Sequence, residues 1–90
     1  MKDIKVGDVV KALSGRDKDR YFLVVDVSDK FAFIANGKTR KINHLKKKNV
    51  NHLIKAAAAT LCSDAEKIKR GEPFGNERLK KAITRAIQNQ

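Results

Sequence analysis

The chain has 90 residues, and Lys and Arg outnumber Asp and Glu by 21 to 10, giving a formal net charge of +11. A chain of this length buries one modest core, which excludes a large active-site cleft and favours one domain with at most a small appendage. The excess of positive charge favours a polyanionic partner, and RNA, DNA and acidic lipid all remain open on charge alone.

Membrane insertion and disulfide bonding are both disfavoured. No apolar run approaches the roughly 20 residues that span a bilayer, and the first residues lead directly into a strand-like pattern. Cys62 is the only cysteine, so no internal disulfide can form and a reducing compartment is acceptable. We therefore expect a cytoplasmic protein with no signal peptide and no membrane partner.

The first part of the chain predicts a β-hairpin with a charged tip. Apolar runs at 9–13 and 21–27 are joined by Ser14, Gly15 and alternating positive and negative charges. In the second run, apolar side chains fall on both sides of the pleat, so this strand should be covered on both faces. A small closed barrel with another element packed outside would satisfy that requirement.

Three more strands are expected downstream. Residues 31–35 are rich in aromatic and branched side chains, which suit a half-buried strand. Asn36-Gly37 is a strong signal for a two-residue type I′ turn, because both residues tolerate positive φ. The elements predicted after it are a fourth strand at 38–42 that pairs back on the third, an exposed loop at 43–49 containing Lys46, Lys47 and Lys48, and a fifth strand at 50–54 that closes the barrel.

Helix-forming residues replace the β-branched ones after about residue 55. One interpretation is a helix that starts at Ser63, with Glu66 completing a capping box, and ends at Gly71. The other is a longer helix from near Ile54; we favour the capped start. A last helix, capped by Asn76, carries an apolar stripe that packs on the barrel or on the other helix.

The predicted fold is therefore α+β. Residues 1–55 form an SH3-like small β-barrel of about five strands, and residues 56–90 form a helical extension of one or two helices packed on or beside it. Periodicity equally allows an open meander or an OB-like barrel.

The basic side chains gather in the charged tip and in an acid-free segment at 38–48. Loops of a small barrel can converge along one side, which would merge both groups into a single positive surface that follows a phosphate backbone. The phenylalanines are expected in the core, and only Tyr21, beside the loop, is a partial exception, so backbone and shape recognition is favoured over base reading. The candidate RNA-binding residues are Arg16, Lys18, Arg20, Lys38, Arg40, Lys41, His44, Lys46, Lys47 and Lys48.

Metal binding and catalysis are poorly supported by the sequence. His44, His52 and Cys62 match no structural zinc spacing. The serines have no histidine at a suggestive position, and no phosphate-cradling glycine loop precedes a helix. We expect no enzymatic activity, no cofactor, no metal and no small-molecule substrate.

The first fifty-odd residues resemble a known family. The spacing of Gly7-Asp8, Gly15 and Lys18 before a valine-rich strand resembles the KOW motif, and the turn at 36–41 running to His52-Leu53 extends the likeness. The chain is most similar to small bacterial KOW-domain RNA-binding proteins related to the KOW-containing large-subunit ribosomal proteins of archaea and eukaryotes. The resemblance implies an SH3-like barrel that contacts ribosomal or other structured RNA through the motif's loop, with Arg16, Lys18 and Arg20 as loop contacts and Arg40 and Lys41 nearby.

One position departs from the family pattern. Members usually have glycine where this chain has Asp19, a position suited to a left-handed backbone that aspartate resists more, and the carboxylate adds negative charge beside the expected contacts.

The leading hypothesis is a non-enzymatic RNA-binding protein associated with the ribosome or the translation apparatus, with ribosomal RNA and the large ribosomal subunit as expected partners. One alternative is a protein-protein adaptor of the transcription or translation machinery, which would use an apolar sheet edge and the final helix. A second alternative is nonspecific binding to DNA.

Overall fold

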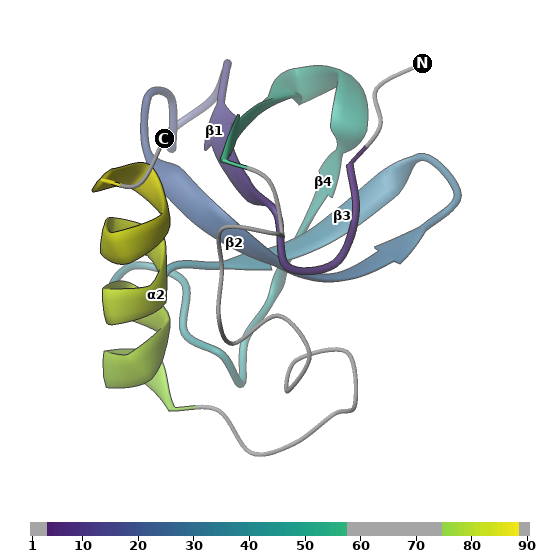
Figure 1. Cartoon of the computed structure of the whole chain (residues 1–90). Helices are drawn as coiled ribbons and strands as arrows, with labels where there is room; N and C mark the ends of the chain where they lie inside the picture. Colours follow the sequence, from purple (N-terminus) through teal and green to yellow (C-terminus); the bar gives the residue numbers. More distant parts are fainter. Residues whose placement is uncertain (1–3, 58–74, 89–90) are drawn as a thin grey trace.

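The hairpin expected at the start of the chain forms as β1 (Val9–Ala12) and β2 (Tyr21–Ser28), which pair antiparallel (Figure 1). The computed structural model describes residues 4–57 and 75–88. Strand β2 turns at Asp29 into β3 (Phe31–Ala35), as the aromatic and branched side chains predict. Asp29 has a φ of 53°, a left-handed conformation that aspartate tolerates in turns.

The rest of the sheet comes from β4 (Lys46–Asn49), the 3-10 turn η1 (Val50–His52) and β5 (Leu53–Ala57). The strand order is β4-β3-β2-β1-β5, with every neighbouring pair antiparallel. The α+β class and the five strands are therefore confirmed, and the order is compatible with an SH3-like arrangement. The expected closure is wrong, because β4 and β5 follow one another through η1 and form the two opposite edges of an open sheet.

The strand predicted at 38–42 is wrong. A type I′ turn needs positive φ at both central residues, but only Gly37 has it, with a φ of 79°. The Asn36 side chain instead accepts hydrogen bonds from the backbone N–H groups of Lys38 and Arg40, each at 2.9 Å, and folds 36–40 into a compact turn. The partner of β3 is β4, so the lysines predicted in a loop lie in a strand.

The prediction for residues 50–54 is wrong in its first half. Residues 50–52 form η1, and the fifth strand begins at Leu53 and continues to Ala57. The alternative helix from near Ile54 is wrong for the same reason. The helix predicted from Ser63 to Gly71 and the position of Cys62 lie outside the described residues.

The start of β2 is covered on both faces, as its unbroken apolar run predicts. Phe22 and Val24 belong to one buried cluster, which also contains Val10, Ile34 and Leu53. Leu23 points to the opposite face, into a second cluster completed by the C-terminal helix. The coverage ends further along the strand: its register against β3 shifts between Val24 and Asp26, and Val27 is 40% exposed.

Helix α2 (Asn76–Gln88) lies beside the sheet (Figure 1), and its buried side chains complete the second cluster. Its buried residues, Leu79, Ala82, Ile83 and Ala86, repeat at steps of three and four, which confirms the predicted stripe and places it against the sheet. The helix begins at Asn76 itself, and the Gly75 carbonyl accepts from the Leu79 N–H at 3.0 Å, so Asn76 is the first helical residue and not the cap that the sequence predicted. Within residues 4–57 and 75–88, no helix is long and apolar enough to cross a membrane.

Candidate nucleic-acid interface

The loop between β1 and β2 has a defined backbone that Asp19 does not disturb. Gly15 and Asp19 both have positive φ, 82° and 69°, and the Asp19 N–H donates to the Ala12 carbonyl at 2.8 Å. Aspartate is one of the few residues with a side chain that visit this region readily. Asp19 therefore adopts the left-handed conformation that was expected to suit glycine at this position, and its negative charge remains in the loop.

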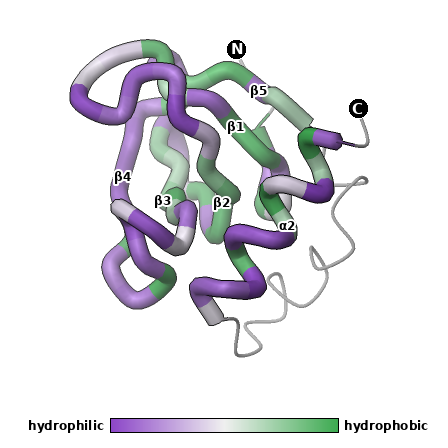
Figure 2. Tube along the Cα trace, turned by 90° about the vertical axis from the view of Figure 1, so that its left-hand side faces the viewer, coloured by the Kyte–Doolittle hydropathy of each residue, from purple (hydrophilic) through white to green (hydrophobic). Residues whose placement is uncertain are grey.

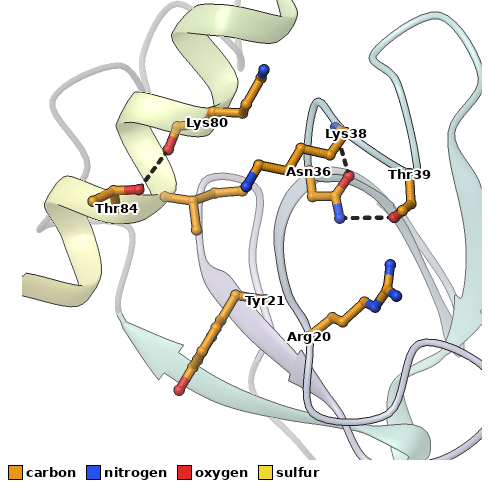
Figure 3. Close-up of a pocket in the computed structure, with 8 residues that line it drawn as sticks. Arg20, Tyr21, Asn36, Lys38, Thr39, Lys80 and Thr84 are labelled. Carbon is orange, nitrogen blue, oxygen red and sulfur yellow. Dashed lines mark hydrogen bonds between the residues drawn. The ribbon is translucent and has the colours of Figure 1, made fainter.

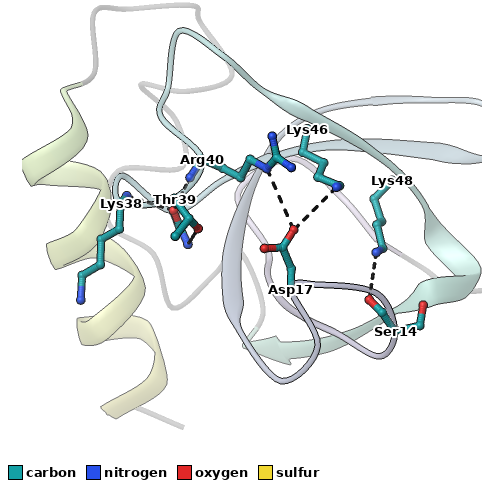
Figure 4. A network of polar contacts seen from close by, with 8 residues as sticks. Ser14, Asp17, Lys38, Thr39, Arg40, Lys46 and Lys48 are labelled. Atoms are coloured by element: carbon teal, nitrogen blue, oxygen red, sulfur yellow. Dashed lines mark hydrogen bonds and ion pairs between the residues drawn. The ribbon is translucent and has the colours of Figure 1, made fainter.

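Asp17 connects this loop to the second basic segment (Figure 4). The Asp17 residue is only 7% exposed, and its Oδ2 lies 3.7 Å from Nζ of Lys46 and 4.0 Å from Nε of Arg40. The acid thus holds cations from β4 and from the 36–40 turn against the β1–β2 loop. We call this arrangement of Asp17, Arg40 and Lys46 the Asp17 cluster.

The lysines of β4 do not share one direction, because successive side chains of a strand point to opposite faces. Lys48 follows Lys46 towards the loop, and its ammonium donates to the Ser14 carbonyl at 3.0 Å. Lys47 lies on the other face, with Nζ 4.3 Å from the centre of the Phe31 ring, a cation–π contact. Figure 2 shows that β4, at the edge of the sheet, is strongly hydrophilic, in contrast to the largely apolar β1.

The predicted single surface is therefore formed in part. The structure brings Arg40, Lys46 and Lys48 to the loop that carries Arg16, Lys18 and Arg20, and these last three are exposed. Lys47 is on the opposite face of the strand. Lys41 and His44 are exposed in the segment before β4, where the His44 N–H donates to the Lys41 carbonyl at 2.9 Å. Lys38 faces a different neighbour, helix α2.

Helix α2 adds basic residues that the prediction did not include. A cavity of about 350 Å³ lies between the 36–40 turn and the helix (Figure 3). A second hollow shares Lys38, Lys80 and Thr84 with it and continues along the helix past Lys81 and Arg85. The residues lining the first cavity are Arg20, Tyr21, Asn36, Lys38, Thr39, Lys80, Ile83 and Thr84.

Close backbone contact fixes the helix beside the turn. A Cβ at Gly37 would collide with the carbonyl oxygen of Asn76, and the positive φ of Gly37 also disfavours any side chain. Oδ1 of Asn76 accepts from the backbone N–H of Ile42 at 2.8 Å. Asn36-Gly37 was recognisable as a turn in the sequence, but its role as a docking point for α2 was not.

One lysine of helix α2 already forms an ion pair within the helix. Nζ of Lys80 lies 2.8 Å from Oε1 of Glu77, one turn earlier on α2. The hydrogen bond from Lys80, and next the attraction of its charge, lower the pKa of the Glu77 carboxyl below its ordinary value. Lys38, Lys81 and Arg85 are therefore the stronger candidates for an external anion.

A serine and a histidine also meet, which the sequence did not indicate. Oγ of Ser14 lies 3.1 Å from Nδ1 of His52, and the His52 carbonyl accepts from the Leu13 N–H at 2.8 Å. Both contacts fasten the β1–β2 loop to η1, so we assign the pair to loop anchoring. Across residues 4–57 and 75–88, no three His, Cys, Asp or Glu side chains are grouped as metal ligands would be.

Comparison of the chain with known protein families and with curated proteins finds no match.

Proposed function

We propose that the protein binds structured RNA, without catalysis, through the β1–β2 loop and the cations gathered beside it. The observation that carries this proposal is the Asp17 cluster, which joins two basic segments that are far apart in the sequence. Together the segments 14–20 and 36–48 hold nine Lys and Arg side chains and two acids. Such an excess on adjacent loops suits a phosphate backbone.

The cations divide into two roles. Arg40, Lys46 and Lys48 are engaged with Asp17 or the Ser14 carbonyl, so they position the loop and add to the field around it. Arg16 and Lys18 are exposed and extend from the loop, where they can reach phosphate oxygens. Arginine forks onto a phosphate with two donors, whereas lysine acts as a mobile point charge. The outward pair is thus the expected contact.

The resemblance to KOW proteins favours RNA among the possible polyanionic partners. The resemblance implies contact with ribosomal or other structured RNA through the motif's loop, and we propose ribosomal RNA of the large subunit as the ligand and the cytoplasm as the location. On charge alone, DNA is the alternative ligand. An adaptor role is the alternative function, and binding of a protein partner with an affinity that does not depend on salt would favour it. Binding is therefore compared for three ligands: a duplex RNA, a duplex DNA of the same sequence, and isolated ribosomal subunits.

The test measures RNA affinity across a salt series for Lys18→Gln and for the matched control Lys30→Gln. Both lysines are exposed and each variant loses one charge, but Lys30 lies in the β2–β3 turn at the other end of β2. We expect Lys18→Gln to weaken binding and to lower the slope of log K against log salt by about 1, while Lys30→Gln retains the wild-type slope. Equal effects of the two variants, or tighter binding of DNA than of RNA, would contradict the proposal.

A further inference from the structure

The cavity between the 36–40 turn and α2 combines positive charge with an exposed ring. Among residues 4–57 and 75–88, those that line this cavity and the hollow that continues it along α2 include four Lys and Arg side chains besides Lys80 and no Asp or Glu. Tyr21 is 39% exposed, whereas Ile83 beside it is 8% exposed and forms an apolar part of the wall. Figure 3 shows the Lys38 side chain extending from the turn across the cavity towards the helix.

The walls of this cavity are held in place independently of any ligand. Gly37 packs against the backbone of Asn76, and Asn76 in turn binds the Ile42 N–H. Within the turn, Nδ2 of Asn36 donates to Oγ1 of Thr39 at 3.0 Å. A site preorganised in this way loses little entropy when a ligand enters.

We propose that this cavity receives one unpaired nucleotide of the bound RNA. Its base lies against the Tyr21 ring and Ile83, while its phosphate lies between Arg20 and Lys38. The strand then continues along α2, where Lys81 and Arg85 contact the next phosphates. The inference rests on the proposed function and deepens it, because it names the feature of the RNA that this part of the surface selects.

The chemistry of the cavity favours an unpaired nucleotide over other anions. Stacking of bases on aromatic rings beside a basic groove is the common mode of single-strand binding, and it tolerates every base. A fully paired duplex keeps its bases inside the helix and presents only phosphate and ribose. An acidic peptide would match the cations but has no flat group for Tyr21. The volume, about 350 Å³, lies within the range of ligand cavities, roughly 300–1,000 Å³.

Binding at Tyr21 can be followed by its intrinsic fluorescence, because it is the only tyrosine and the chain has no tryptophan. The experiment titrates the full chain with a blunt RNA duplex and with the same duplex carrying one bulged nucleotide. We expect the bulged RNA to bind about tenfold more tightly and to quench the Tyr21 fluorescence, since one stacked base supplies that much affinity. Tyr21→Phe should keep the preference for the bulge, and Tyr21→Ala should lose it.

Two variants separate the phosphate contacts from general charge. Lys38→Gln should reduce the preference for the bulged RNA, whereas Lys30→Gln, remote from the cavity, should leave it unchanged. Equal affinity for both duplexes, or Tyr21 fluorescence that stays constant in the bulged complex, would overturn the inference while leaving RNA binding intact. Equal quenching by a glutamate-rich peptide would also overturn it. Failure to bind either duplex at low salt would contradict the proposed function itself.

Discussion

Two junctions hold the basic surface together, and they do so by different physics. At the first, Asp17 attracts Arg40 and Lys46 to the β1–β2 loop, with cation side chains that are 40% and 29% exposed. At the second, Gly37 and Asn76 join the 36–40 turn to α2 through backbone contact and one hydrogen bond. Exposed ion pairs weaken with salt, whereas close packing does not. Only the first junction should therefore respond to ionic strength.

The largest effect is expected at Gly37. Gly37→Ala forces a Cβ into the Asn76 carbonyl and onto a φ of 79°, so we expect the free energy of unfolding to fall by about 2–4 kcal/mol in urea titrations. Gly75→Ala is the matched control, because a Cβ there meets nothing within 4 Å. Comparable losses in the two variants would contradict the close approach of turn and helix.

Asp17→Asn should cause the second-largest loss of stability. The isosteric amide removes the negative charge from a nearly buried position between Arg40 and Lys46, so we expect a loss of about 1–2 kcal/mol at low salt that shrinks as salt rises. Asp29→Asn, in the exposed β2–β3 turn, should stay within about 0.5 kcal/mol of wild type, because asparagine also tolerates positive φ. A salt-independent loss at Asp17 would rule out an electrostatic junction.

Asn76→Ala should destabilise the second junction less than Gly37→Ala does. It removes the acceptor for the Ile42 N–H, and we expect a loss of about 1 kcal/mol in the free energy of unfolding. The loss should be the same in dilute and concentrated salt, in contrast to that of Asp17→Asn. Urea titrations of both variants at two salt concentrations make the comparison directly, and matching salt responses would remove the distinction between the junctions.

The smallest effect concerns protonation on α2. Because Lys80 lowers the pKa of Glu77, the contribution of this pair to stability is present above the ordinary glutamate pKa and is lost as the pH falls through the lowered value. Lys80→Gln should raise the pKa of Glu77 towards its ordinary range in an NMR titration. An unchanged Glu77 pKa would show that Lys80 is directed elsewhere, into the cavity.

Local patterns predicted much of the fold. The apolar runs of the first hairpin, the aromatic-rich β3 and the stripe on α2 each follow from short-range periodicity, and each is present. The fourth strand was predicted in the wrong place because the Asn36 side chain accepts hydrogen bonds from two backbone N–H groups and folds the segment into a turn. These hydrogen bonds depend on the geometry of the whole turn. The lysine run 46–48 has low strand propensity, and it becomes β4 through pairing with β3 and contacts at the distant loop.

The candidate site was predictable only as a set of charges. The sequence showed that basic residues gather at 14–20 and 38–48, but strand alternation then separates Lys47 from Lys46 and Lys48. Lysines on an edge strand also discourage pairing with another sheet, which is a sufficient role for Lys47. Asp17 was visible in the charged loop, yet its burial between cations from other segments depends on the tertiary fold.

The most direct test of the central account is an NMR titration of the labelled protein with a structured RNA. The account predicts that backbone shifts at Arg16 and Lys18 change most, and that those at Asp29 and Lys30 in the β2–β3 turn change least. Addition of salt should reverse the changes as the complex dissociates. Changes centred on the β2–β3 turn, or a complex that persists undiminished in high salt, would contradict a phosphate-binding surface at the β1–β2 loop.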